Sequence, residues 1–202
     1  MFSPRMMGTI QGRQENVARK EGTYMKTRTW ITALALIMML TLTTTSLASD
    51  NYGALAVREG NTYTLEQMLT YALQDEQLAL AEYQAILNAF DTDRPFSNII
   101  KAEEHHVSLL LPLFAAHGIA VPENTAQEHV TLPATLKEVF AVGVEVEVNN
   151  IAMFDTFLAQ NDLPDDVREV FESLKRASEN HLRAFERGLN RLEGGRHRQS
   201  GR

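Results

Sequence analysis

Residues 96–114 read FSNIIKAEEHHVSLLLPLF, and this stretch indicates both how the chain folds and what lies in its core. Its apolar residues recur every three or four positions, which is the spacing of one face of an α-helix. Glu103 and His106 fall on the same face, in the middle of the apolar stripe. A carboxylate and an imidazole three residues apart on a helix can bind one cation together, although exposed helices also carry such pairs by accident.

Three further amphipathic segments repeat this pattern. Glu76, Glu147 and His181 each lie in the middle of an apolar stripe with helical spacing. If the four stripes face a common core, three carboxylates and two imidazoles meet in a nearly dry space, where unshielded charges are very costly. A bound cation is the simplest way to reduce this cost. For His181 alone, the alternative is a core histidine that hydrogen-bonds to a carbonyl. The predicted metal ligands are Glu76, Glu103, His106, Glu147 and His181.

Capping residues mark the starts of four predicted helices between residues 63 and 192. Threonine with a glutamine or glutamate three residues later forms a capping box, and proline suits the first turn of a helix. The predicted starts are Thr64 with Gln67, Pro95, Thr135 with Glu138, and Asp162 with Pro164. The predicted ends lie near Phe90, Gly118, Asn161 and Leu192.

The connections between these helices predict the topology. Short turns join the first helix to the second and the third to the fourth, whereas residues 118–134 form a long connection. Stretched out, that connection could cover roughly 55 Å, more than the height of a bundle about 35 Å tall. The sequence therefore predicts an all-α four-helix bundle in which a long crossover joins two antiparallel pairs. Residues 49–62 are predicted to be a polar lead-in and residues 193–202 a disordered tail.

Residues 25–48 have the pattern of a secretory signal peptide. Positive residues 25–28 precede an apolar run at 30–42, and small residues at 46–48 offer a cleavage site. A membrane anchor that stays uncleaved is the alternative. Residues 1–24 belong neither to the signal-peptide pattern nor to the predicted bundle. The codons for residues 20–22 are compatible with a ribosome-binding site. We therefore expect translation to begin at Met25, with a genuine N-terminal extension as the alternative.

Charge and cysteine content exclude several classes of function. Residues 49–202 keep 13 of the 19 lysines and arginines and 24 of the 26 acidic residues, for a net charge of about −11. Such a charge argues against nucleic acid, and against an anionic membrane surface once the leader is cleaved. The chain has no cysteine, so disulfides and thiolate metal sites are excluded. Any metal must be held by oxygen and nitrogen.

Other polar residues near the stripes are expected to play smaller parts. Asn150, one turn after Glu147, is interpreted as a partner that orients a ligand, with a weak ligand or a satisfied core amide as alternatives. Tyr83 could bond a ligand or simply belong to the core. Residues beside the stripes are expected to face solvent, and these are Asp75, Glu82, Glu104, His105 and Glu145.

The chain resembles the ferritin-like carboxylate bundles, in which a carboxylate helix and a Glu-x-x-His helix are followed by a second such pair. It is most similar to a ferritin-like family of unknown function, DUF2202, over residues 62–190. The segments that carry the resemblance are residues 75–83, 100–106, 142–147 and 178–185. By this resemblance Glu76, Glu103 and His106 form a first metal site with Glu103 bridging, and Glu147 and His181 form a second. Ser178 stands where classical members place another bridging Glu, so the second site lacks one ligand.

These observations lead to a hypothesis for function. Oxygen and nitrogen ligands with open positions suit iron that meets dioxygen or peroxide, so one or two non-haem iron ions are expected, with manganese as the alternative. The expected chemistry is ferrous oxidation or peroxide reduction in a periplasmic or extracellular protein, with an unidentified electron donor. A non-catalytic metal scavenger and a structural bundle with a decayed site are the other hypotheses. Whether the chain forms a homodimer stays open.

Overall fold

The computed structural model describes the backbone of residues 51–199 and the side chains of residues 51–194. The expected untranslated segment 1–24 and the expected signal peptide 25–48 lie outside the described residues. Within the described range the chain is all-α and contains no strand.

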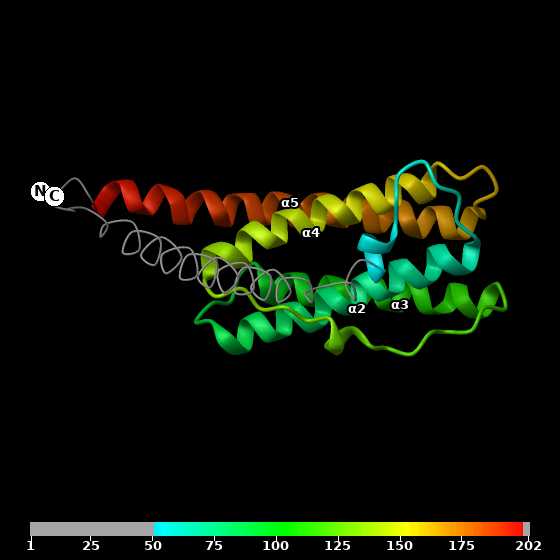
Figure 1. Cartoon of the computed structure of the whole chain (residues 1–202), viewed down its shortest axis with the longest axis horizontal. Coiled ribbons are helices and arrows are strands. Elements are labelled where there is room, and N and C mark those ends of the chain that lie inside the picture. The colour runs from blue at the N-terminus through cyan, green and yellow to red at the C-terminus, as the bar shows by residue number, and fades with distance from the viewer. Residues whose placement is uncertain (1–50, 200–202) are drawn as a thin grey trace, which may run out of the picture. The chain divides into compact units, whose positions relative to one another are not determined.

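Four long helices form the bundle (Figure 1). They are α2 (Leu65–Ala89), α3 (Phe96–Ala116), α4 (Leu136–Leu158) and α5 (Asp165–Gln199). Helix α2 packs mainly against α3, and α4 packs mainly against α5. Each pair is antiparallel, and the connection after α3 runs back along the bundle so that α4 points the same way as α3. The predicted fold class, two antiparallel pairs joined by a long crossover, is confirmed.

Both predicted capping boxes form. The Thr64 side chain accepts from the backbone N–H of Gln67, whose own side chain accepts from the Thr64 N–H. Thr135 and Glu138 make the same reciprocal pair at the start of α4. These bonds satisfy backbone N–H groups that the first turn of a helix cannot satisfy, and so they set where α2 and α4 begin.

The helix ends agree with the sequence except in the second pair. Gly118 follows α3 with φ of 66°, the left-handed conformation that glycine adopts without strain. Helix α4 ends at Leu158, slightly before the predicted Asn161. Helix α5 continues to Gln199, so the predicted end near Leu192 is wrong. Charged and glutamine side chains favour helix, and Glu193 pairs with Lys137 of α4 at 2.9 Å.

Two short 3-10 helices fasten the connecting segments to the bundle. Helix η1 (Gly53–Ala56) lies in the lead-in and contacts α2 and α4, and η2 (Ala126–Glu128) lies in the crossover and contacts α2. The ring of Tyr52 stacks on His129, with centroids 3.9 Å apart. The lead-in and the crossover are therefore packed parts of the fold.

The apolar core consists of two clusters, and every helix of the bundle contributes to both. The first is rich in phenylalanine and includes Leu69 of α2, Phe114 of α3, Phe154 of α4 and Phe171 of α5. The second includes Tyr83 of α2, Phe96 of α3, Phe140 of α4 and Phe185 of α5. Apart from Gly143, the buried residues between the two clusters on each helix are polar or charged.

Glycines allow α4 and α5 to pack closely beside the second cluster. A Cβ atom on Gly188 would collide with the ring of Phe140. A Cβ atom on Gly143 would lie 3.0 Å from the ring of Phe185. Each glycine therefore makes room for a phenylalanine of the facing helix.

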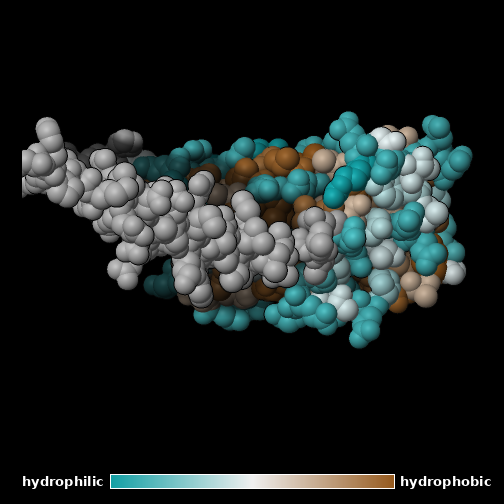
Figure 2. Space-filling view, viewed as in Figure 1, coloured by the Kyte–Doolittle hydropathy of each residue, from teal (hydrophilic) through white to brown (hydrophobic). Residues whose placement is uncertain are grey.

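One face of the bundle illustrates the character of its surface. On the face shown in Figure 2, hydrophilic residues dominate the coloured surface and hydrophobic residues show between them. Val142 and Val148 of α4 are among the few large hydrophobic side chains that are exposed. Across residues 51–199, the structure contains no helix of the length and hydropathy that a bilayer span requires.

Candidate metal centre

The five predicted ligands lie together in the layer between the two core clusters. Each of them is at most 9% exposed, and every helix of the bundle supplies at least one. On each helix the ligand continues the apolar stripe, as Glu103 does between Ile99 and Leu110. The periodicity that buries the hydrophobic side chains therefore also carries the carboxylates and imidazoles inward.

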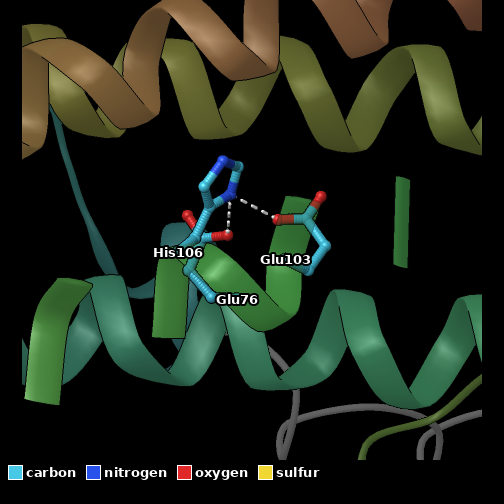
Figure 3. Close-up of side chains that lie close together, drawn as sticks. All are labelled: Glu76, Glu103 and His106. Carbon is cyan, nitrogen blue, oxygen red and sulfur yellow. Dashed lines mark hydrogen bonds and ion pairs between the residues drawn. The ribbon is translucent and has the colours of Figure 1, made fainter. Parts of the chain in front are cut away.

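Glu76, Glu103 and His106 form the first group of candidate ligands (Figure 3). Nδ1 of His106 lies 3.0 Å from Oε2 of Glu76 and 2.7 Å from Oε2 of Glu103. Glu103 and His106 are one helical turn apart on α3, whereas Glu76 reaches them from α2. One nitrogen and two carboxylate oxygens thus converge on the same point.

Glu103, Glu147 and His181 form the second group. Nδ1 of His181 lies 3.1 Å from Oε1 of Glu103 and 3.5 Å from Oε1 of Glu147. Glu103 belongs to both groups, with Oε2 directed to the first and Oε1 to the second. The rings of His106 and His181 lie side by side with centroids 5.9 Å apart.

Without a cation, the carboxylates of this layer carry opposite pKa shifts. Burial raises the pKa of Glu76 well above its ordinary value, and the nearby carboxylate of Glu103 adds to the shift. Burial also raises the pKa of Glu147. Burial alone would raise the pKa of Glu103 too, but hydrogen bonds from Glu76, His106 and His181 outweigh it and lower that pKa. The raised pKa values of Glu76 and Glu147 favour their neutral forms, which repel Glu103 less than carboxylates would.

His181 is held in its charged form by the carboxylates around it. Burial would lower its pKa, but hydrogen bonds to Glu103 and Glu147 raise the pKa of His181 to about 9. A metal ion bound at the same nitrogen would have to displace this proton.

Asp75 is buried, and the expectation that it faces solvent is wrong. Its Oδ1 accepts from the backbone N–H of Ala54 at 2.8 Å, and its Oδ2 accepts from the Asn150 amide at 2.5 Å. Helix η1 covers it so closely that a Cβ atom on Gly53 would lie 2.7 Å from Oδ1. Burial raises the pKa of Asp75 to about 7, although the Ala54 hydrogen bond opposes the shift. The pattern of polar and apolar residues along α2 does not predict this burial, because it depends on contacts with a segment 21 residues earlier in the sequence.

The three predicted supporting residues have distinct partners. The Tyr83 hydroxyl donates to Oε1 of Glu147 at 3.2 Å, so it contacts a candidate ligand directly. Asn150 donates to Asp75 and leaves its own Oδ1 buried without a partner among the described residues. Ser178 is buried, and its hydroxyl donates to the carbonyl of Leu174 at 3.2 Å.

The remaining polar residues beside the stripes are mostly exposed, as expected. Glu104, His105 and Glu145 face solvent. Glu82 is half-buried, and burial raises its pKa to about 7, against the opposing hydrogen bond from the Thr131 backbone. None of these residues belongs to either group of candidate ligands.

The spacing of the donor atoms suits a first-row transition metal. Bonds of about 2.1 Å in tetrahedral or octahedral geometry would separate neighbouring ligand atoms by roughly 3.0–3.5 Å. The distances between His nitrogens and carboxylate oxygens in the two groups run from 2.7 to 3.5 Å. All ligand atoms of one group lie within 4.8 Å of one another. The residues can therefore hold one cation, or two that share Glu103.

Comparison with known proteins supports the fold. No family model matches the chain. An uncharacterised protein of Methanocaldococcus jannaschii, MJ0754, is 26% identical in an alignment of 132 residues that covers 58% of this chain and 70% of that protein. The crystal structure of this hypothetical archaeal protein superposes with a TM-score of 0.57 and 22% identity, over 68% of this chain and 86% of that chain. At this identity the structural likeness shows a shared architecture alone.

Proposed function

We propose that the protein is a metal-binding carboxylate bundle that holds non-haem iron, as one ion or as two ions that share Glu103. The observation that carries this proposal is the position of the Glu103 carboxylate, whose two oxygens face different histidines at 2.7 and 3.1 Å. Burying three carboxylates in one layer costs much more free energy than an apolar layer would. A bound cation would offset that cost and would explain why the three carboxylates are buried together.

The donor set favours iron, with manganese as the alternative. It consists of carboxylate oxygens and imidazole nitrogens, and the absence of cysteine from the sequence excludes thiolates. Bound iron would supply one-electron redox chemistry towards dioxygen or peroxide. The protein side chains hold the ion, balance its charge and keep the site nearly dry. Since the chain has no thiolate centre of its own, electrons must come from a separate donor.

The ferritin-like resemblance is part of this proposal. The order of the ligands along the chain supports it: a Glu on α2, a Glu-x-x-His pair on α3, a Glu on α4 and a His on α5. We assign the chain to the ferritin-like bundles on this pattern, closest to the DUF2202 family. Ser178 is the one departure, since it replaces the Glu that would complete a second Glu-x-x-His pair.

The alternative function is metal scavenging without turnover, and Ser178 favours it. Without a glutamate at position 178, each group has only two carboxylates and one histidine, so the two groups would hold their ions less tightly than a site with a second shared carboxylate. Steady-state oxidation of ferrous iron, or reduction of peroxide with an added reductant, would show that the bound metal catalyses the chemistry expected from the sequence. Stoichiometric binding that stops after one equivalent would support scavenging. Failure to bind any metal, with no rise in melting temperature, would leave only a structural bundle.

Metal analysis of paired variants tests the proposal. Glu103→Ala with His106→Ala removes the shared carboxylate and one imidazole, and this variant should bind no iron or manganese. Glu104→Ala with His105→Ala removes the same residue types from adjacent exposed positions of α3. That control should retain the wild-type metal content. Equal metal content in the two variants would contradict the proposal.

Export is proposed from the sequence of residues 25–48. Intact-mass analysis of protein recovered from the periplasm or the medium should give a chain that begins at Ser49. A native peptide from residues 1–19 would overturn the expected start at Met25, and a retained leader would support the anchor instead.

A further inference from the structure

A pocket of about 320 Å³ opens beside the candidate metal centre and is lined by three arginines. Its walls come from the start of α3 and from the second half of α5. The lining residues are Arg94, Pro95, Asn98, Ile99, His181, Ala184, Arg187 and Arg191. No aspartate or glutamate is among them, although the whole chain has a net charge of −7. The pocket is therefore a local concentration of positive charge on an acidic protein.

The helix periodicity connects this pocket to the metal centre. Residues 181, 184, 187 and 191 follow one another at steps of three or four, so they lie along one face of α5. On α3, Ile99 lines the pocket one turn before Glu103. Because the two helices are antiparallel (Figure 1), both rows lead from the arginines towards the ligand layer. His181 belongs to the pocket and to the second group of ligands at once.

Among the described residues, no acidic side chain pairs with the three guanidinium groups, so they can interact with a ligand. In contrast, Arg176, which lies earlier on α5, pairs with Glu172 one turn away. A guanidinium presents N–H donors in a planar fork that matches the oxygens of phosphate and carboxylate groups. The amide of Asn98 adds a further donor within the same pocket.

We propose that this pocket binds a small, multiply charged oxyanion of the phosphate class at the entrance to the metal centre. Three guanidinium groups and one amide supply donors for phosphate oxygens, whereas only Ile99, Pro95 and Ala184 offer apolar contacts to an organic substituent, so free phosphate is the favoured occupant. The position of the anion beside a metal rests on the proposed function. Two divalent cations would bring four positive charges to three carboxylates, and an anion near His181 would offset the excess.

Calorimetric titration of the metal-free protein with inorganic phosphate, at fixed ionic strength, tests the pocket by itself. Wild-type protein should bind one phosphate per chain saturably. The variant Arg187→Gln with Arg191→Gln should bind at least tenfold more weakly, whereas Arg176→Gln should match the wild type. Arg94→Gln, on a different element, gives an independent second variant and should also bind more weakly. Absence of saturable binding, or equal loss in the pocket variants and the Arg176→Gln control, would overturn the proposal.

Two further arms identify the anion and its place. Glycerol phosphate should bind more weakly than inorganic phosphate, and tighter binding of the ester would overturn the assignment to free phosphate. In protein loaded with Mn²⁺, phosphate should change the electron paramagnetic resonance spectrum of the ion in the wild type and not in the double arginine variant. An unchanged spectrum in the wild type would overturn the connection to the metal centre. If the wild type binds no metal, the proposed function fails, and the metal-free titration still decides the pocket.

Discussion

Glu103 on α3 lies across the bundle from His181 on α5, with Oε1 of the carboxylate 3.1 Å from Nδ1 of the imidazole. The other oxygen of the same carboxylate lies 2.7 Å from His106 on its own helix. One side chain therefore connects the α2–α3 pair to the α4–α5 pair through the ligand layer. Loss of its charge should affect both groups of candidate ligands together.

Glu103→Gln should impair metal binding at both groups. The substitution keeps the size of the side chain but removes the charge and replaces one of the two shared oxygens with an NH2 group that cannot bind a cation. We expect a loss of affinity larger than the ~10–100-fold that removal of a residue supporting a ligand costs. Competition with a chelator of known affinity measures the change, and Glu104→Gln on the exposed face serves as control. Retention of one tightly bound ion would show that Glu103 does not serve both groups.

Ser178→Glu should increase the capacity of the second group. It places a carboxylate three residues before His181, which completes a second Glu-x-x-His pair on α5. Metal content per chain should rise, while the metal-free variant should melt at a lower temperature because it buries another carboxylate. Ser178→Gln adds the same bulk without the charge and should not raise the metal content. Equal metal content in the Glu and Gln variants would contradict the prediction.

Gly188→Ala should destabilise the bundle through the close approach of α4 and α5. Its new methyl group would collide with the ring of Phe140, and such overpacking typically costs about 1–3 kcal/mol of unfolding free energy. Gly194→Ala is the matched control, because nothing lies within 4 Å of its Cβ position. That control should gain up to about 1 kcal/mol from helix propensity. Urea unfolding separates the two, and equal stability would show that α4 and α5 can move apart freely.

Glu82 should make the stability of the protein depend on pH. Burial raises the pKa of Glu82 from its ordinary 4.5 to about 7 in the folded state. Between these values the unfolded chain has released the proton and the folded chain still holds it. Stability from this group therefore falls as pH rises from about 4.5 through 7. Glu82→Gln has no such proton and should lose less stability over that range.

Urea unfolding of metal-free protein at about pH 5 and about pH 8 measures this difference, since most of the linkage then lies between the two conditions. Glu145→Gln, at an exposed position of α4, should follow the wild type at both values. An identical pH dependence in Glu82→Gln and wild type would show that the folded-state pKa of Glu82 is close to its ordinary value.

Much of the fold could be predicted because local interactions specify it. Thr64 and Thr135 cap their helices through residues only three positions away, so short segments of sequence determine where α2 and α4 begin. The burial of the five candidate ligands could be predicted because each lies on a stripe whose apolar members are buried. Helix periodicity is enough to predict that Glu76 and His106 lie in the same layer.

Contacts between distant segments could not be predicted. Asp75 looked like a solvent residue because its neighbours on α2 do not explain its burial. It is buried by η1 of the lead-in and by Asn150 of α4, neither of which is near it in sequence. The stacking of Tyr52 on His129 is of the same kind. The sequence predicts too early an end for α5 because Gly194 and Gly195 favour a break, whereas the ion pair of Glu193 with Lys137 supports the helix there.

The polar layer between the two hydrophobic clusters fixes the vertical register of the helices. If one helix slid along its neighbours by a single turn, about 5.4 Å, its carboxylate or imidazole would be pushed against phenylalanine rings. The two hydrophobic clusters on either side of this layer include side chains from every helix, so a shift of any helix would place a polar side chain against apolar ones. Without a bound cation this layer makes folding less favourable, but it also selects one alignment of the helices among several that apolar packing alone would tolerate.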